Sequence, residues 1–314
     1  MAQIAQARRV LLTGASGFVG RALVPLLLEA GWTVRATSRS PAAFAPHERL
    51  EFIAADLASG EAIEHLVQET DAVVHLAARV HVMHDAARDP LGEFRRANVA
   101  VTELLARAAH SVGASQFVFA STIKVNGEGQ GERPYRESDP PAPQDPYAVS
   151  KLEAELSLES SGVPCTILRP PLMYGPGVKG NFARLMKFVR RGWPIPLASV
   201  RNRRSLLFVD NFCSAILAAL EQPAPGVRLY LVSDGEDVSV SELVRRMGMA
   251  LGRPARLLPC PVAILQALGA LAGMQAEIHR LTDSLLVDSS RLRELGWHPR
   301  ASLDEGLRRT AQSF

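Results

Sequence analysis

The chain has 314 residues, enough for one large domain or two unequal ones, and its 47% hydrophobic and 21% charged residues are typical of a soluble enzyme. Its net charge is only +3 with both signs interspersed, so we expect no nucleic-acid partner. Cys165, Cys213 and Cys260 lie far apart and indicate neither a disulfide framework nor a metal site. Because no secretory signal is visible, we expect a reducing, cytoplasmic location.

The first half of the chain alternates strand and helix patterns. Short apolar runs predict strands at 10–12, 33–37, 51–54, 72–76, 117–120 and 165–168. Amphipathic patterns predict helices between them at 18–30, 61–69, 91–112 and 147–161. This alternation predicts an α/β fold, a Rossmann-type doubly wound parallel sheet with helices on both faces.

The pattern changes near residue 173, where glycine- and proline-rich loops and shorter helices begin. We therefore predict a dinucleotide-binding domain at 1–172 and a smaller C-terminal, mainly substrate-binding domain at 173–314. A strand near 226–233 is expected to return to the first sheet. The uncharged stretch 257–274 predicts a helix of about a dozen residues, too short to be an integral membrane segment. The sequence is compatible with three roles for this helix: core packing, docking, and peripheral contact with a membrane.

A glycine-rich turn follows the first predicted strand. Gly14 and Gly17 let the main chain approach a pyrophosphate, Gly20 lets the following helix pack close to the strand, and the helix N-terminus offers N–H groups to the phosphates. This arrangement predicts dinucleotide binding. The coenzyme contacts expected here come from Gly14, Ser16, Gly17, Phe18, Val19 and Gly20.

The end of the second predicted strand bears on which coenzyme binds. An NAD site usually places an acidic residue there to accept the ribose hydroxyls, but no Asp or Glu occurs between Glu29 and Glu48. Arg39 offers a guanidinium for a 2′-phosphate instead. The sequence therefore favours NADP(H), with NAD(H) as the alternative.

Tyr147 and Lys151 form the pattern with the clearest chemical meaning. Asp145 and Pro146 predict the start of a helix, which places Tyr147 and Lys151 one turn apart on one face. A phenol titrates near pH 10, and a neighbouring ammonium lowers that pKa. We therefore predict that Tyr147 is a general acid/base assisted by Lys151. An exposed helix pair with no function is the alternative.

Several motifs occur in the order found in one enzyme superfamily: Gly14-x-x-Gly17-x-x-Gly20, Asp56-Leu57, His75-Leu76-Ala77-Ala78, Asn98, Ser121-Thr122, Tyr147-x-x-x-Lys151 and Arg169-Pro170. In these motifs the chain resembles the extended short-chain dehydrogenases/reductases that modify sugar nucleotides, over nearly its whole length. The resemblance implies that Tyr147 exchanges a proton with the sugar and that Lys151 holds the nicotinamide ribose. It also implies that Thr122, with Ser121 as the fallback, hydrogen-bonds the reacting oxygen.

The same resemblance implies further contacts, each with a structural alternative. Asp56 is expected near adenine but also suits a helix cap, and Asn98 suits either the active site or a solvent-facing position. Lys124 is an unusual cation beside the expected site, either a substrate contact or a surface lysine. The remaining implied coenzyme contacts are Leu57, Leu76, Ala77, Ala78 and Pro170.

On the substrate side, the resemblance places Arg204 and Arg280 on a nucleotide diphosphate and Asn181 at a helix start against the substrate. Solvated arginines and a simple helix cap are the alternatives. His81 and His84 lie close together but lack further ligands at metal spacing, so no metal site is expected.

The stretches 123–128, 169–182 and 200–206 resemble the 4-ketoreductases that form UDP-N-acetylquinovosamine in surface-polysaccharide synthesis. The resemblance implies reduction of the C4 keto group of a UDP-4-keto-6-deoxy-N-acetylhexosamine, with a UDP-hexosamine 4-epimerase as the alternative. A 4,6-dehydratase is less favoured because Ile123-Lys124 stands where that branch has an acidic pair, and a non-catalytic dinucleotide sensor is disfavoured by the intact Thr122 and Tyr147. The resemblance also implies a homodimer formed through 91–112 and 147–161. Leu104, Leu105 and Ala108 are candidates for part of its apolar face, and covering the sheet is the alternative role for them.

Overall fold

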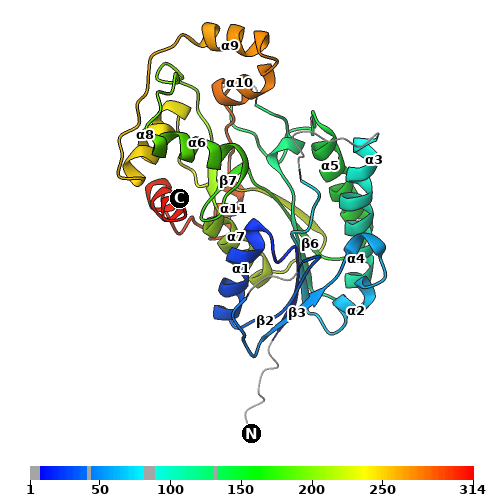
Figure 1. The fold of residues 1–314 in the computed structure, drawn as a ribbon. Coiled ribbons are helices and arrows are strands. Elements are labelled where there is room, and N and C mark those ends of the chain that lie inside the picture. The colour runs from blue at the N-terminus through cyan, green and yellow to red at the C-terminus, as the bar shows by residue number, and fades with distance from the viewer. Residues whose placement is uncertain (1–7, 41–43, 81–88, 130–132) are drawn as a thin grey trace. The chain divides into compact units, whose positions relative to one another are not determined.

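The structure is a computed structural model of the 314-residue chain, and it describes residues 8–40, 44–80, 89–129 and 133–314 (Figure 1). The chain folds into two units. Unit 1 comprises Met1–Asn126, Pro140–Pro170 and Phe212–Tyr230, and unit 2 comprises Gly127–Asp139, Pro171–Asn211 and Leu231–Phe314. The chain therefore passes between the units several times.

Unit 1 is built on a seven-stranded sheet. Strands β1 to β6 pair in parallel, and the apolar residues of β1 lie between β2 and β4, as when Leu12 pairs with Ala36 on one side and Val74 on the other. Such strands are buried on both faces, which explains their uninterrupted apolar runs. The predicted doubly wound α/β fold is confirmed. The strand order is β3 (Leu50–Ala54), β2 (Thr33–Ser38), β1 (Arg9–Thr13), β4 (Ala72–His75), β5 (Gln116–Ala120), β6 (Cys165–Arg169) and β9 (Val227–Leu231).

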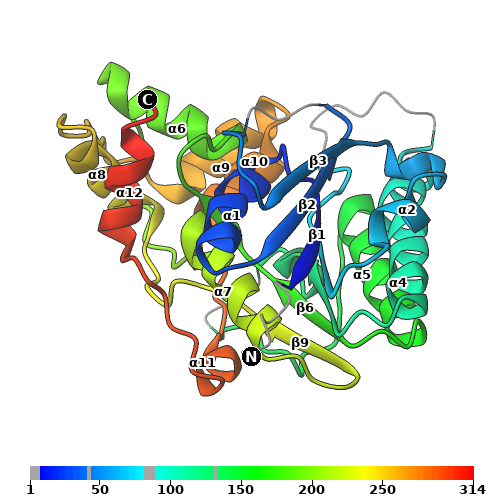
Figure 2. The same ribbon diagram turned by 90° about the horizontal axis from the view of Figure 1, so that it is seen from below.

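Helices cover both faces of this sheet (Figure 2). Helices α1 (Phe18–Glu29) and α7 (Val209–Glu221) lie on one face, and α2 (Ile63–Val67), α4 (Val101–Ser111) and α5 (Pro146–Ser160) lie on the other. The helix expected at 91–112 is divided into α3 (Pro90–Phe94), a π-helical segment η2 (Arg95–Ala100) and α4. Short 3₁₀ turns, η1 (Leu57–Ser59) and η3 (Ile123–Val125), follow β3 and β5.

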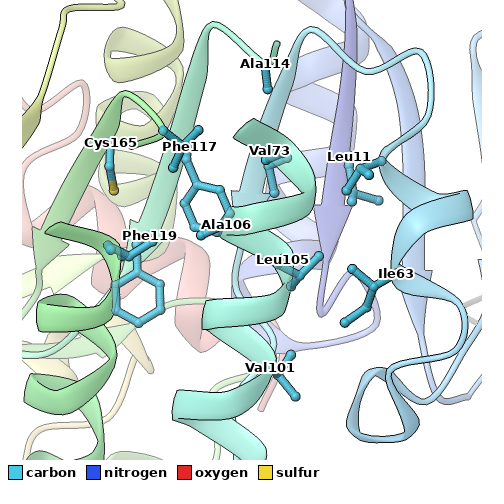
Figure 3. Close-up of a cluster of buried hydrophobic side chains, with 14 of the residues drawn as sticks. Leu11, Ile63, Val73, Val101, Leu105, Ala106, Ala114, Phe117, Phe119 and Cys165 are labelled. Atoms are coloured by element: carbon cyan, nitrogen blue, oxygen red, sulfur yellow. The ribbon is translucent and has the colours of Figure 1, made fainter. Parts of the chain in front are cut away.

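A continuous core joins the sheet to α4 (Figure 3). Leu105 and Ala106 of α4 are fully buried, in one cluster with Phe117 and Phe119 of β5 and Val73 of β4. Burying a large side chain of this kind contributes about 1.5–3 kcal/mol. Leu105 therefore covers the sheet, which was one of the two roles considered for it, and it does not contribute to a dimer face.

Unit 2 is a smaller assembly of short strands and helices. Strand β7 (Leu172–Tyr174) pairs in parallel with β8 (Leu206–Phe208). Tyr174 is buried, stacks on Phe182, and donates a hydrogen bond to Asp234 over 3.2 Å. Burial raises the pKa of Asp234 to about 6. The helices of this unit are α6 (Gly180–Arg191), α8 (Val240–Ala250), α9 (Val262–Leu271), α10 (Gln275–Thr282), α11 (Ser290–Glu294) and α12 (Leu303–Ala311).

The helix expected within 257–274 is α9, which has 10 residues. Across the described ranges, no helix has both the length and the apolar character needed to cross a membrane.

Candidate active site

The predicted coenzyme residues follow strands that end at one edge of the unit 1 sheet. Because β1, β2, β3, β4, β5 and β6 are parallel, the loops after them share the edge at which ligands bind in open α/β sheets. The residues that follow each of these strands therefore lie at the same edge of the sheet.

The loop after β1 is close-packed where the glycines occur. Gly14 has φ +71°, and a Cβ there would lie 2.7 Å from the Ala77 nitrogen. A Cβ on Gly20 would lie 2.5 Å from the Gly14 oxygen. Gly17 is exposed at the N-cap of α1, where no side chain bonds the first N–H groups of the helix. The N-terminus of α1 is thus open to an anionic ligand, as dinucleotide phosphates require. Ser16, Phe18 and Val19 are partly buried around this point.

The loops after β2 and β3 present residues of opposite charge. Arg39 directly follows β2 and is exposed, as a contact to a 2′-phosphate requires. Asp56 accepts a 3.1 Å hydrogen bond from the Ala58 nitrogen and caps η1. The structure thus shows the helix cap that was the alternative role for Asp56. The next residue, Leu57, is buried.

A buried polar chain lies behind the loop after β4. His75 bonds the Thr13 hydroxyl through Nδ1 at 2.7 Å and the Thr102 hydroxyl through Nε2 at 3.1 Å. Burial, reinforced by the charge of Lys151, lowers the pKa of His75 to about 3, so the ring is neutral at pH 7. The Thr13 hydroxyl in turn accepts a hydrogen bond from the Ala77 nitrogen, which positions Leu76, Ala77 and Ala78 beside the glycine loop.

Asn98 lies in the π-helical segment and is buried. Its amide oxygen accepts from the Arg79 nitrogen at 2.8 Å, and its amide nitrogen donates to the Arg79 oxygen at 3.1 Å and to the Ser150 hydroxyl at 2.9 Å. Asn98 does not face solvent. It ties the loop after β4 to α5, which makes it a positioning residue for this edge.

Helix α5 presents Tyr147 and Lys151 as the spacing predicts. Its N-cap is Asp145, whose carboxylate accepts from the Ala148 nitrogen at 2.7 Å. Tyr147 is partly buried and packs edge-on against Phe94, with ring centroids 6.0 Å apart. Lys151 is buried, and its Nζ lies 3.8 Å from the centroid of the Phe119 ring. The interpretation of this pair as an exposed helix pair is therefore wrong.

The electrostatics of this pair differ from the sequence expectation. Burial, with the charge of Asp145, raises the pKa of Tyr147 above its ordinary value. Burial lowers the pKa of Lys151 to about 7, and the nearby Glu155 carboxylate opposes that shift. We expected the ammonium to lower the tyrosine pKa, but desolvation is the largest influence on both groups. At neutral pH the phenol of Tyr147 therefore holds its proton.

Ser121 and Thr122 occupy different environments after β5. The Ser121 hydroxyl donates to the buried carboxylate of Glu155, which also pairs with Arg169. Arg169 donates to the Asn126 oxygen at 2.9 Å as well. Ser121 thus belongs to a buried polar cluster. Thr122 is partly buried at the N-cap of η3, where its hydroxyl accepts from the Lys124 nitrogen at 3.3 Å.

Lys124 joins η3 to the start of α5. Its Nζ lies 2.5 Å from the Asp145 carboxylate, and η3 also packs against α5. This ion pair connects the turn that carries Thr122 to the helix that carries Tyr147. Pro170 is buried and its backbone oxygen accepts a 2.9 Å hydrogen bond from the Ile123 nitrogen, which fixes the same turn from the end of β6.

The predicted substrate residues lie in unit 2. One nitrogen of Arg204 donates to the backbone oxygens of Arg280 and Asp283 at 2.8 and 3.0 Å, and burial lowers the pKa of Arg204. The Arg280 guanidinium lies 3.5 Å from the Glu128 carboxylate. Arg204 and Arg280 are therefore neighbours. Asn181 is exposed in the first turn of α6, where its side chain accepts from Arg184 and does not cap the helix.

Glu155 is the buried polar residue next to the candidate site that the sequence reasoning missed. It lies four residues after Lys151, so Tyr147, Lys151 and Glu155 repeat at helical spacing along one side of α5. That spacing was the available signal. The histidines weighed as metal ligands, His81 and His84, fall outside the described residues. Within the described part of the chain, no group of three or more His, Cys, Asp or Glu side chains is placed to hold a metal ion.

Comparison with known proteins identifies relatives along the full length. A UDP-glucose 4-epimerase of Vibrio cholerae is 41% identical, with 98% of this chain and 95% of that protein covered. A 2-alkyl-3-oxoalkanoate reductase of Stenotrophomonas maltophilia is 29% identical over 97% of this chain and 99% of its own. Among solved structures, MoeE5 in complex with UDP-glucuronic acid and NAD is 27% identical, with a TM-score of 0.78 and coverage of 97% and 98%. The model of the NAD dependent epimerase/dehydratase family matches residues 10–233, a stretch that holds the glycine loop, Thr122, Tyr147 and Lys151, and the chain belongs to that family.

Proposed function

We propose that the protein reduces the C4 keto group of a UDP-4-keto-6-deoxy-N-acetylhexosamine with NADPH. The observation that carries this proposal is the Tyr147–Lys151 pair at the start of α5, beside a turn that presents Thr122. A ketone that accepts a hydride needs a proton on its oxygen. The raised pKa of Tyr147 keeps the phenol in the proton-donating form at neutral pH.

The residues of the chain have separate roles in this reaction. The bound dihydronicotinamide would supply the hydride. Tyr147 donates its phenolic proton to the sugar O4, and the Thr122 hydroxyl donates a hydrogen bond that orients the same oxygen. Lys151 holds the nicotinamide ribose and stabilises the phenolate that remains.

The coenzyme-binding part of the proposal rests on the open N-terminus of α1 and on Arg39. The loop can pack this tightly before α1 only because Gly14 and Gly20 carry no Cβ, which would clash with neighbouring backbone atoms. The exposed guanidinium of Arg39 supports a 2′-phosphate, and no acidic residue stands between Glu29 and Glu48 to accept the hydroxyls of NADH. On the substrate side, the neighbouring Arg204 and Arg280 support a diphosphate, as in a UDP-sugar.

A second candidate is a UDP-hexosamine 4-epimerase, which the Vibrio cholerae relative favours by its name and 41% identity. In that reaction Tyr147 first removes the proton of the 4-hydroxyl, and the hydride returns to the opposite face of the 4-keto sugar. The two activities use the same side chains but differ in whether coenzyme is consumed.

One experiment distinguishes these two functions. Purified protein is incubated with UDP-N-acetylglucosamine and, separately, with a UDP-4-keto-6-deoxy-N-acetylhexosamine plus NADPH or NADH. We expect net oxidation of the reduced coenzyme when the keto sugar is present. This oxidation should be faster with NADPH than with NADH, and NADPH should bind with the lower Kd. Conversion of UDP-N-acetylglucosamine into its C4 epimer without net oxidation would replace the reductase with the epimerase, and equal or tighter binding of NADH would overturn the assignment of Arg39.

A further inference from the structure

Helix α9 presents an apolar face that the described part of unit 2 does not cover. Ile264, Leu268 and Leu271 repeat at intervals of four and three residues and are 50%, 57% and 86% exposed. Leu265 and Gly269 are the buried residues of α9, and Gly269 faces Ile278 of α10, the helix that lies beside α9 (Figure 1). Large exposed side chains at helical spacing mark a binding face rather than chance exposure.

Basic residues are concentrated in the segment that precedes α9 and in a second segment that is joined to it. Residues 181–200 and 251–276 together contain six basic residues and no acidic residue. These two segments are joined in the structure: the Arg253 guanidinium donates to the Arg190 oxygen at 3.0 Å, and the Leu258 nitrogen donates to the Ile195 oxygen at 2.9 Å. The basic residues are Arg184, Lys187, Arg190, Arg191, Arg253 and Arg256, all of them exposed.

An exposed aromatic pair belongs to the same joined segments. Trp193 is 49% exposed and packs edge-on against Phe188, with ring centroids 5.1 Å apart. The Arg191 guanidinium lies 5.2 Å from the Trp193 ring centroid. Tryptophan is enriched where proteins contact the polar boundary of a lipid bilayer.

We propose that this surface, formed by α9 and residues 184–193 and 253–258, binds the surface of a membrane that contains anionic lipids. The leucines of α9 enter the boundary between headgroups and acyl chains, and the arginines and lysine contact the lipid phosphates. With 10 residues, α9 lies in the plane of the membrane rather than across it. A second copy of this chain is a poorer occupant, because it would place six basic residues against six others.

The first test is co-sedimentation of the purified protein with vesicles of phosphatidylglycerol and phosphatidylcholine, and with vesicles of phosphatidylcholine alone. We expect binding to the anionic vesicles that weakens as salt is added, and little binding to the neutral ones. The double variant Leu268→Glu/Leu271→Glu should bind at least about tenfold more weakly, because it buries charge instead of apolar surface. Met249→Glu changes an equally exposed side chain outside these segments and should bind as the wild type does.

The second test measures contact between this surface and the lipids. Trp32 and Trp297 are buried, so the exposed Trp193 reports on this surface. Brominated anionic lipids should quench Trp193 fluorescence in the wild type and not in the double variant, while turnover of a soluble sugar nucleotide stays the same in both. Absence of vesicle binding, equal binding by the double variant, or self-association that the double variant abolishes would each overturn the proposal.

Discussion

The two adjacent hydroxyl residues at the end of β5 differ in what their side chains contact. Ser121 donates to the buried Glu155 carboxylate, whereas the Thr122 hydroxyl accepts only a long hydrogen bond from its own turn among those described. A group that orients a substrate oxygen must have a hydrogen to donate. The structure therefore supports Thr122 over Ser121 for this role, a choice that the residue types alone left open.

We predict that substitution of Thr122 mainly lowers kcat, whereas substitution of Ser121 mainly lowers the free energy of unfolding. Thr122→Val should lower kcat about 100-fold, by loss of a hydrogen bond to the reacting oxygen, and should lower the free energy of unfolding by about 0.5 kcal/mol, by loss of the long cap bond to Lys124. Ser121→Ala should lower the free energy of unfolding by about 1–3 kcal/mol, because Glu155 loses a buried partner, and should lower kcat less. Steady-state kinetics and urea denaturation measure the two effects. A greater loss of kcat in Ser121→Ala would assign the role to Ser121 instead.

Lys151 makes the stability of the coenzyme-free protein depend on pH. Its pKa is about 7 in the folded protein and ordinarily 10.5, so the unfolded chain binds more protons between these values. The free energy of unfolding should therefore rise with pH through this window, by at most about 1.4 kcal/mol per pH unit. Lys151→Met should remove this contribution and stabilise the protein at pH 7. An unchanged pH slope in the variant would contradict the buried position of Lys151.

At the scale of elements, α5 joins the site to the sheet. Tyr147, Lys151 and Glu155 succeed one another along the helix, and Glu155 pairs with Arg169 at the end of β6. Both partners of this ion pair are only 4% exposed. Removing one partner would leave an uncompensated buried charge.

We predict that Arg169→Met lowers the free energy of unfolding by about 3–5 kcal/mol. The matched control is Arg107→Met, which breaks an exposed pair with Glu103 on α4 and should change stability by less than about 0.5 kcal/mol. Urea denaturation of the two variants makes the comparison. Equal small losses would show that the Glu155–Arg169 pair does not hold α5 against β6.

The sequence predicted the elements that have strong local patterns. The strands and helices of unit 1 follow apolar runs and the Asp145 cap, so they emerged without tertiary information. The π-helical segment around Asn98 was not predicted from the sequence. The Asn98 side chain hydrogen-bonds Arg79 and Ser150, which are far away in the sequence. Glu155 was missed for the same reason, since its partners Ser121 and Arg169 lie on other elements.

Unit 2 was predicted less completely, for the same physical reason. The backbone of Arg204 bridges to Val238 and to Leu285, which are distant segments that sequence periodicity does not connect. Strands β7 and β8 have three residues each, too few to show a period. The proposed substrate residues of this unit therefore rested on the family resemblance alone.

At the scale of the whole molecule, we infer a homodimer formed through α4 and α5, which pack against each other. With Leu105 in the core, the apolar residues on these helices that remain exposed include Leu104 at 45% and Leu156 at 53%. Light scattering should give the mass of a dimer for the wild type and of a monomer for Leu104→Glu/Leu156→Glu. Met249→Glu, a similar change on α8, should stay dimeric. A monomeric wild type at micromolar concentration would contradict this inference.

The most direct test of the whole account is the Tyr147→Phe variant, assayed for NADPH-dependent reduction of the keto sugar and for NADPH affinity. The variant keeps the ring that packs on Phe94 but lacks the proton that O4 must receive. We predict turnover about 100- to 10,000-fold below the wild type with an unchanged Kd for NADPH. Turnover equal to that of the wild type would contradict the assignment of Tyr147 as the proton donor, and with it the function built on this residue.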